Sequence, residues 1–248
     1  MIRVTAVSHV FNALQEGAEL PPLDAALKAV SREHFRRIDR FIQLALLGSG
    51  LCAVERQLAP DCGLYMGSGL GPMTGNIATQ EQLIRDRELP KPFNFINTLG
   101  NSAGYYVAKN LGLTGQNLFV SRRGASFEAA LMAAWLDLGA GVVSQALVGV
   151  VEEATLPLAE HRRRQGLAAD MPVAEGSHWL LLEKDAATGQ RLEWRHVMQH
   201  EEPTATRSAA FHDSISGARV TEGLMKGESV VLAEGNALSG WDLFNFSA

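Results

Sequence analysis

A layered α/β fold, with helices packed on a sheet, is the fold class that the sequence predicts. Short apolar segments bounded by glycine alternate along the chain with longer segments in which apolar residues recur at helical spacing. Glycine-rich breaks at residues 67–71 and 139–141 separate strand-like from helix-like segments. We expect residues 1–248 to form one domain, because this length is enough to bury one large core.

The first half of the chain predicts two helices around one buried strand. In residues 31–58, apolar residues recur every three or four positions, as on one face of an amphipathic helix. Residues 63–67 are apolar and lead into a glycine-rich run, which predicts a buried strand followed by a backbone turn. Residues 78–87 predict a polar surface helix that ends before Pro90 and Pro92, because proline cannot donate the helix hydrogen bond.

The second half continues this alternation. We expect a helix over residues 97–111 that ends at Gly112, and an alanine-rich helix over residues 125–138 closed by Gly139 and Gly141. The other predictions are strands at residues 117–121, 145–151, 179–182, 192–198 and 228–234, a turn at 185–189, and a polar surface segment at 156–171.

Composition and charge exclude several classes of function. The net charge of -5 gives no basic field for a phosphate backbone, so nucleic acid is not an expected partner. Cys52 and Cys62 are too few for a disulfide framework, and neither they nor the histidines show metal-ligand spacing. The longest apolar stretches fall short of the roughly 20 residues that cross a bilayer. We expect a cytoplasmic chain with no leader sequence, membrane span, metal or cofactor.

Five segments of the chain carry a family resemblance. They are RRIDRFIQLALLGSG (36–50), LYMGSGLGPM (64–73), FINTLGNSAGYYVAKNLGLTGQNLFVS (95–121), ALVGVVEEAT (146–155) and EGSHWLLLEK (175–184). In this order they resemble the β-ketoacyl synthases of the thiolase-like superfamily, most strongly over residues 31–185. The resemblance implies a layered thiolase-like fold with a truncated second half, of which residues 200–248 are a shortened remnant.

The resemblance also implies where a nucleophile would lie. Synthases carry a cysteine in the turn after the strand at 117–121, where a helix N-terminus lowers the pKa of the thiol. Here the turn is Ser121-Arg-Arg-Gly-Ala-Ser126, and Gly124 occupies the expected cysteine position. Since glycine has no side chain to form an acyl thioester, no catalytic residue is expected there. His212 lies in a segment that faintly resembles a catalytic-histidine motif of the family, and one histidine without the thiol leaves that site incomplete.

A synthase homologue without the cysteine resembles the chain-length factors of type II polyketide, aryl polyene and fatty acid systems. The resemblance implies a heterodimer with a full-length β-ketoacyl synthase that uses acyl and malonyl thioesters of an acyl carrier protein. The implied interface is an edge strand, which needs a partner in any case, and the turn after it: Asn117, Leu118, Phe119, Val120, Ser121, Arg122 and Arg123. The implied gate at the end of the partner's acyl tunnel comprises Phe95, Asn97, Thr98, Ser102, Tyr105 and Tyr106.

Two other activities stay open. Gly100-Asn-Ser102-Ala-Gly104 matches the G-x-S-x-G elbow of α/β-hydrolases, in which Ser102 would be the nucleophile of an esterase. An elbow needs an apolar strand before the serine, however, and Asn97 and Thr98 interrupt that run. The second alternative is a residual malonyl decarboxylase.

Two charged features also need an explanation. The run His161-Arg-Arg-Arg164 is either a solvated face or a contact for an acidic carrier protein. Glu152 and Glu153 end a predicted buried strand, where we expect one of them to be a hydrogen-bonded structural carboxylate rather than a catalytic acid.

Overall fold

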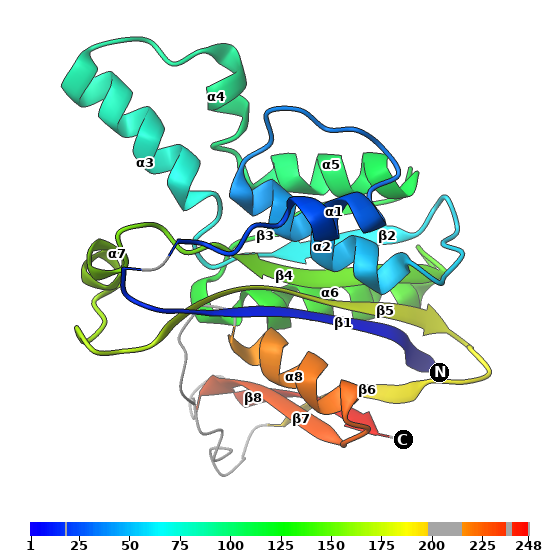
Figure 1. The fold of residues 1–248 in the computed structure, drawn as a ribbon. Coiled ribbons are helices and arrows are strands. Elements are labelled where there is room, and N and C mark those ends of the chain that lie inside the picture. The colour runs from blue at the N-terminus through cyan, green and yellow to red at the C-terminus, as the bar shows by residue number, and fades with distance from the viewer. Residues whose placement is uncertain (18, 198–214, 237–239, 248) are drawn as a thin grey trace.

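The computed structural model describes residues 1–17, 19–197, 215–236 and 240–247. Within them, eight strands form one sheet in the order β3-β2-β4-β5-β1-β6-β8-β7 (Figure 1). The strands are β1 (Ile2–Leu14), β2 (Gly63–Gly67), β3 (Asn117–Val120), β4 (Gln145–Glu152), β5 (Val173–Lys184), β6 (Gln190–Val197), β7 (Val230–Asn236) and β8 (Gly240–Ser247). The helices are α1 (Asp24–Val30), α2 (Arg40–Ala53), α3 (Met73–Glu81), α4 (Pro92–Ile96), α5 (Gly100–Leu111), α6 (Ser126–Ala140), α7 (Leu158–Gln165) and α8 (Ile215–Met225). The predicted α/β fold class is confirmed.

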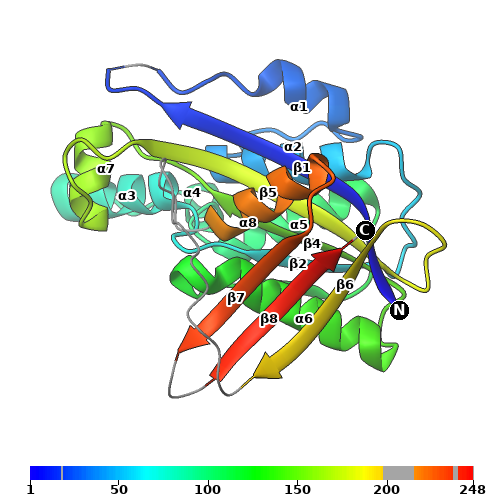
Figure 2. The same cartoon turned by 90° about the horizontal axis from the view of Figure 1, so that it is seen from below.

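The sheet divides the molecule into layers. Helices α1, α2 and α5 cover one face, and α6 and α8 cover the other (Figure 1). Beyond α6 and α8, strands β6, β8 and β7 turn back beneath these helices, which therefore lie between two parts of the same sheet (Figures 1 and 2). One apolar core joins Phe127 of α6 to Phe244 of β8, and a second joins Phe41 of α2 to Val107 of α5.

A buried tryptophan fixes the spacing between α2 and the sheet. Trp179 of β5 is fully buried and pairs with Gly149 of β4 across the ladder. A Cβ built on Gly149 would lie 2.1 Å from the indole ring. A Cβ built on Gly48 of α2 would lie 2.6 Å from the same ring. Glycine is therefore required on both sides of Trp179, because a close-packed interior has no spare volume there.

Several predicted helix boundaries are wrong. The helix expected over residues 31–58 begins only at Arg40, because Arg37 adopts a φ of 56° that interrupts helical backbone. Asp39 then caps α2, with its Oδ1 accepting a 3.0 Å hydrogen bond from the Ile42 amide. Gly112 and Gly141 close α5 and α6 in the left-handed conformation, as predicted. Gly139 instead lies within α6.

Other elements are longer, shorter or additional. The polar helix expected at 78–87 begins at Met73 and continues as a single π-helical turn, η1 (Gln82–Asp86). The helix expected over 97–111 is preceded by the separate helix α4 and begins at Gly100, and the strand expected at 117–121 ends at Val120. No prediction was made for β1, α1, α8 or β8. His212 and the rest of residues 198–214 lie outside the described residues.

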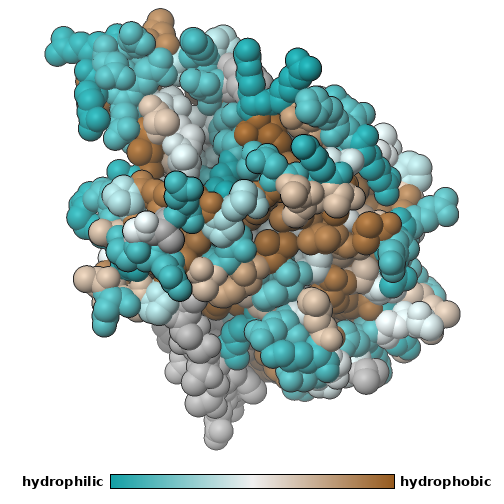
Figure 3. Space-filling model, viewed as in Figure 1, coloured by the Kyte–Doolittle hydropathy of each residue, from teal (hydrophilic) through white to brown (hydrophobic). Residues whose placement is uncertain are grey.

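Helices α3 and α4, with η1 between them, form an arm (residues 73–99) that rises away from the sheet (Figure 1). In the space-filling view, apolar side chains interrupt its hydrophilic surface at the tip and toward the base (Figure 3). The large apolar side chains exposed on the arm are Leu83, Ile84, Leu89, Phe95, Ile96 and Leu99. Exposed apolar side chains gathered in this way are typical of a protein-binding surface.

Among the helices that the structure describes, none combines the length and the apolar character needed to span a membrane.

Candidate functional site

The turn between β3 and α6 contains the position at which the sequence predicts a missing nucleophile. It forms a short 3-10 helix, η2 (Arg123–Ala125), and Gly124 is exposed in its middle. Buried Ser126 holds the turn together, since its Oγ accepts from the Arg122 amide at 2.8 Å and donates to the Arg123 carbonyl at 2.7 Å. Arg123 has the left-handed φ of 51° that marks the sharpest point of the turn. Neither Arg123 nor Gly124 offers a nucleophilic side chain.

Charged side chains from distant elements surround this turn. The Arg122 guanidinium lies 2.9 Å from the Glu234 carboxylate of β7, so an ion pair ties the turn to the far edge of the sheet. Glu128, in the first turn of α6, is buried, and burial raises the pKa of its carboxyl to about 7. Burial also raises the pKa of Glu234. Sequence reasoning missed Glu128 and Glu234, because no local pattern links them to Arg122.

Strand β3 lies at one end of the sheet and, within the described residues, pairs with β2 alone. The Leu64 amide donates to the Gln116 carbonyl at 2.7 Å, and the Ser68 amide donates to the Val120 carbonyl at 3.0 Å. Because backbone groups alternate sides along a strand, Asn117 and Phe119 direct their N-H and C=O groups toward the open edge. The edge therefore offers a template for another strand.

Helix α5 packs closely on this edge strand through two glycines. A Cβ on Gly100 would lie 2.4 Å from the Phe119 ring, and a Cβ on Gly104 would lie 2.7 Å from Oδ1 of Asn117. These are the two glycines of the G-x-S-x-G pattern. The whole pattern lies inside α5, with no strand before it, and Ser102 Oγ donates to the Ile96 carbonyl at 2.7 Å. The pattern thus provides close packing of a helix on a strand and does not form a nucleophile elbow.

Replacing Ser102 by alanine is expected to lower the free energy of unfolding by about 1 kcal/mol, since one hydrogen bond is lost. We expect any background turnover of p-nitrophenyl esters by the purified chain to be the same for Ser102→Ala and wild type. Loss of ester turnover in the variant would contradict this structural role.

The predicted gate residues divide into two groups. Asn97, Thr98 and Ser102 shape the turn between α4 and α5: Asn97 Nδ2 donates to the Arg37 carbonyl at 3.1 Å, and Thr98 Oγ1 donates to the Phe95 carbonyl at 2.7 Å. By contrast, Phe95 is 54% exposed. Each of the three polar side chains therefore donates a hydrogen bond to a backbone carbonyl, whereas the Phe95 ring is exposed.

The two tyrosines of the predicted gate differ in how far neighbouring rings bury them. Tyr106 packs edge-on against Phe35, with ring centroids 5.3 Å apart, and against Tyr105, with centroids 5.5 Å apart. Tyr105 is 60% exposed, whereas Tyr106 is partly buried. Phe35 was not predicted as part of the site. The arrangement presents Tyr105 at the surface with Tyr106 and Phe35 as a rigid backing.

The paired glutamates at the end of β4 are both buried and structural. Glu152 accepts hydrogen bonds from Ser68 Oγ at 3.2 Å and from the Leu70 amide at 3.3 Å, and it also accepts from the Gly69 amide. It thereby fixes the glycine-rich turn after β2. Glu153 accepts from the Thr74 amide at 2.7 Å. Both side chains therefore make structural hydrogen bonds, where the sequence predicts this for one of them.

The basic run lies on α7, and its charges are already paired within the chain. His161 and Arg162 are buried, and Arg162 pairs with Glu16 at 2.5 Å. Arg163 and Arg164 pair with Glu160 at 2.6 and 2.9 Å. Only part of the run is therefore a solvated face, and it carries little uncompensated charge.

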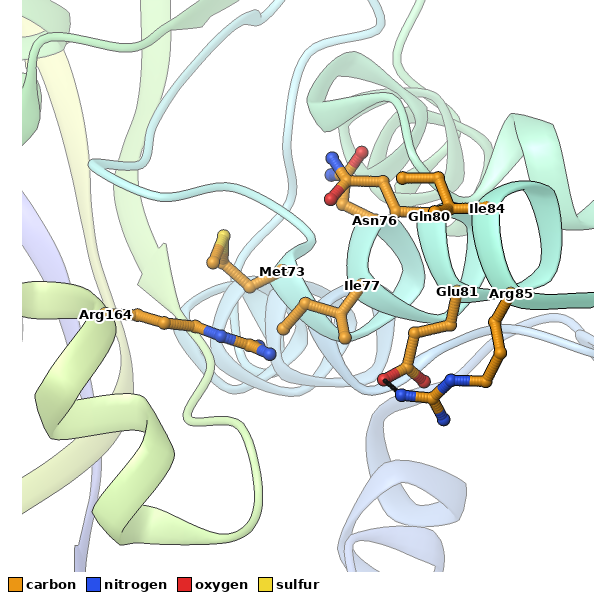
Figure 4. Close-up of a pocket in the computed structure, with 8 residues that line it drawn as sticks. All are labelled: Met73, Asn76, Ile77, Gln80, Glu81, Ile84, Arg85 and Arg164. Atoms are coloured by element: carbon orange, nitrogen blue, oxygen red, sulfur yellow. Dashed lines mark ion pairs between the residues drawn. The ribbon is translucent and has the colours of Figure 1, made fainter.

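A groove separates α7 from the arm. It has a volume of about 340 Å³ and is lined by Met73, Asn76, Ile77, Gln80, Glu81, Ile84, Arg85 and Arg164. Arg164 points across it toward Met73 and Ile77, and Glu81 pairs with Arg85 on the opposite side (Figure 4). Each guanidinium of the groove is balanced by a carboxylate, so the groove has no strong preference for an anion.

The described residues contain neither a cluster of metal ligands nor a reactive thiol. They contain no group of three or more histidine, cysteine, aspartate or glutamate side chains that could hold a metal ion. Cys52 and Cys62 are buried, and burial raises the pKa of each thiol to about 12. Both thiols therefore stay protonated at neutral pH and are poor nucleophiles.

Comparisons with known proteins agree with these features. Residues 12–172 match the β-ketoacyl synthase N-terminal domain family, and no curated protein sequence matches the chain. The ketosynthase ApeO in complex with its chain length factor ApeC from Xenorhabdus doucetiae is similar with a TM-score of 0.61 and 17% identity, over 98% of this chain and 99% of that one. The ishigamide ketosynthase/chain length factor gives a TM-score of 0.65 and 15% identity, over 99% and 98%.

A third structure is similar over part of its length. It is the type II polyketide synthase complex AntDE:AntF, an acyl carrier protein with its ketosynthase, and it gives a TM-score of 0.57 and 16% identity. The match covers 74% of this chain and 58% of that one. The chains matched in the first two complexes, by contrast, are close to this chain in length, as the coverage of both partners shows.

Proposed function

Since the chain belongs to the β-ketoacyl synthase family, through an N-terminal domain that spans residues 12–172, we propose that it is a non-catalytic subunit of the chain-length-factor type. In this proposal it pairs with a full-length β-ketoacyl synthase and shapes the acyl tunnel of that partner during carrier-protein-dependent polyketide or fatty acid elongation, as in aryl polyene systems. The observation that carries the proposal is the β3–α6 turn, where Gly124 and its neighbour Arg123 provide no nucleophile.

The surface around the turn supports a role in pairing. The open edge of β3 lies beside α5, which packs on β3 through Gly100 and Gly104, and the arm ends at exposed Leu99, directly before α5. The proposed interface comprises residues 117–123, of which Arg122 is 62% exposed although it pairs with Glu234. Two of the similar structures are complexes of a ketosynthase with a chain length factor, and a third contains an acyl carrier protein.

The proposal also covers the domain organisation of the chain and its location in the cell. We treat residues 1–248 as one domain, because the sheet joins β1 to β8 through β6 and one apolar core contains both Ile2 and Phe246. We assign the chain to the cytoplasm, in keeping with its two free cysteines. The acyl and malonyl thioesters of the carrier protein would be handled by the synthase partner.

Coexpression with candidate β-ketoacyl synthases tests the proposal. We expect a one-to-one complex in size-exclusion chromatography and carrier-protein-dependent elongation that requires this chain. A Gly124→Ala variant is a suitable control, because it fills the position without adding a nucleophile and should leave elongation intact. A chain that binds no synthase and turns over esters by itself would refute the proposal.

Replacing Tyr105 by alanine is expected to lengthen the acyl products of the reconstituted complex, because the most exposed aromatic ring of the proposed gate is removed. The stability of the chain should change by no more than about 0.5 kcal/mol, since the side chain is at the surface. Mass spectrometry of carrier-bound products measures the length. Tyr106→Phe keeps both ring contacts and should leave product length unchanged, whereas unchanged lengths in Tyr105→Ala and Tyr106→Ala would remove the gate.

A further inference from the structure

Two carboxyl groups lie at the base of the arm, that of buried Glu153 and that of partly buried Asp39, and each has one enclosed oxygen with no hydrogen-bond partner in the described part of the chain. They are Oε2 of Glu153, which follows β4, and Oδ2 of Asp39, which precedes α2. The other oxygen of each side chain is used: Glu153 Oε1 accepts from the Thr74 amide, and Asp39 Oδ1 accepts from the Ile42 amide. A buried polar oxygen without a partner is costly, so this pair requires an explanation.

The charges around the pair do not balance if both groups are ionised. Glu175 of β5 is the third carboxyl nearby, and it is fully occupied by a two-pronged ion pair with Arg40 and a hydrogen bond from Asn12. Arg40 also donates to the Pro21 carbonyl. Within the described residues, the charged groups that raise the pKa of Glu153 are Asp39 and Glu175, and both are acidic.

The two carboxyl groups therefore differ in protonation at neutral pH. Burial, helped by Asp39 and Glu175, raises the pKa of Glu153 to about 8. Burial raises the pKa of Asp39 to about 6. Near pH 7, Glu153 is neutral and has an O-H to donate, while Asp39 is ionised and has an oxygen to accept it.

Both carboxyl groups touch the segments through which the arm joins the body. Glu153 binds the amide of Thr74 in the first turn of α3. A Cβ built on Gly75 would lie 3.5 Å from Asp39 Oδ2 and 3.2 Å from the Asn97 carbonyl, so Asp39 faces both the start and the end of the arm. Asn76 Nδ2 donates to the Thr98 carbonyl at 3.2 Å and ties the same two ends together.

We propose that Glu153 and Asp39 share one proton and that this shared proton fastens the arm to the sheet, so that the arm is held less firmly as the pH rises from acidic to mildly alkaline. Both unpartnered oxygens are then satisfied by one hydrogen bond, made directly or through one water molecule. The fastening lies beneath α3 and concerns how the arm is held, whatever protein the arm binds.

The direction of the pH effect follows from the raised pKa of Glu153. Between its ordinary value of 4.5 and the raised value of about 8, the folded chain holds a proton that the unfolded chain has released. The attachment of the arm therefore weakens as the pH rises through this window. Above pH 8 the loss of attachment free energy is complete.

Hydrogen–deuterium exchange of the full chain tests the proposal. After correction for the intrinsic pH dependence of exchange, the protection of amides in residues 73–99 should fall between pH 5 and pH 8 by up to about tenfold per pH unit and level off above pH 8. Glu153→Gln mimics the neutral carboxyl and should remove this pH dependence. Glu81→Gln removes an exposed carboxyl from the arm itself and should keep it.

Infrared spectroscopy supplies a second measurement that does not depend on the arm. The difference spectrum of wild type minus Glu153→Gln at pH 7 should show the C=O stretch of a buried carboxylic acid, and this band should disappear above pH 8. Taking the difference cancels the band of buried Glu128, which is present in both proteins. Should Glu153→Gln fail to fold, Asp39→Asn in the same two measurements tests the pair. Absence of the band from the difference spectrum, or the same pH dependence of arm exchange in wild type and Glu153→Gln, would overturn the proposal. Neither result bears on pairing with a synthase.

Discussion

Replacing Asn117 by proline is expected to weaken association with a β-ketoacyl synthase by at least about 100-fold while leaving the fold of the chain intact. The amide of Asn117 faces the open edge of β3, so proline removes no hydrogen bond within the sheet. For a strand that pairs along this edge, proline removes a donor and adds a bulky ring at the start of the edge strand. The dissociation constant is measured by titration calorimetry or analytical ultracentrifugation.

Leu118→Pro is the matched control for this prediction. Leu118 directs its backbone groups toward β2, where it pairs with Tyr65, so proline there breaks the sheet itself. Its melting temperature should fall, whereas that of Asn117→Pro should stay close to wild type. Normal binding by Asn117→Pro would show that β3 is not the pairing edge.

Replacing Gly149 by alanine is expected to lower the free energy of unfolding by about 3 kcal/mol, at the upper end of the range for an overpacked core. The new methyl group would lie 2.1 Å from the ring of Trp179, which is fully buried and cannot move aside without displacing its neighbours. Urea denaturation gives the change as a shift of the midpoint at constant slope.

Two further variants make the packing argument specific. Gly139→Ala places its methyl group in open space on α6 and should stabilise the chain by up to about 1 kcal/mol through helix propensity. In a Trp179→Phe background, the cost of Gly149→Ala should shrink, because the smaller ring leaves room for a methyl group. Equal costs in both backgrounds would mean that the indole ring is not the cause.

Local sequence pattern was sufficient to predict the central strands, but it did not predict the strand β1. β2 and β4 are short apolar runs buried on both sides, and they were predicted to within one residue. β1 was missed because it mixes apolar residues with Ser8, His9 and Asn12 and is defined by pairing with β5, far along the sequence. The first predicted helix begins later than expected because of the backbone conformation of Arg37, which apolar spacing does not reveal.

The candidate site shows the same division. Family resemblance pointed to the turn that contains Gly124 and to Tyr105 as a bulky gate residue, and the structure adds that Tyr105 is exposed. The Arg122–Glu234 ion pair and the Asp39–Glu153 pair join residues more than a hundred positions apart, and only the folded chain brings them together. The G-x-S-x-G pattern misleads in the opposite way, because its glycines are needed for packing on Phe119 and Asn117.

The pairing of β1 determines the order in which the chain is able to fold during synthesis. Ile2 pairs with Lys184 and Leu192, so β1 leaves the ribosome long before either of the strands that pair with it in the sheet. At roughly 5–20 residues per second, the strand waits about 10–40 seconds. Such a long-range contact slows folding and exposes a 13-residue strand to other chains. The soluble yield should therefore rise when translation is faster or when a holding chaperone covers β1 while it waits.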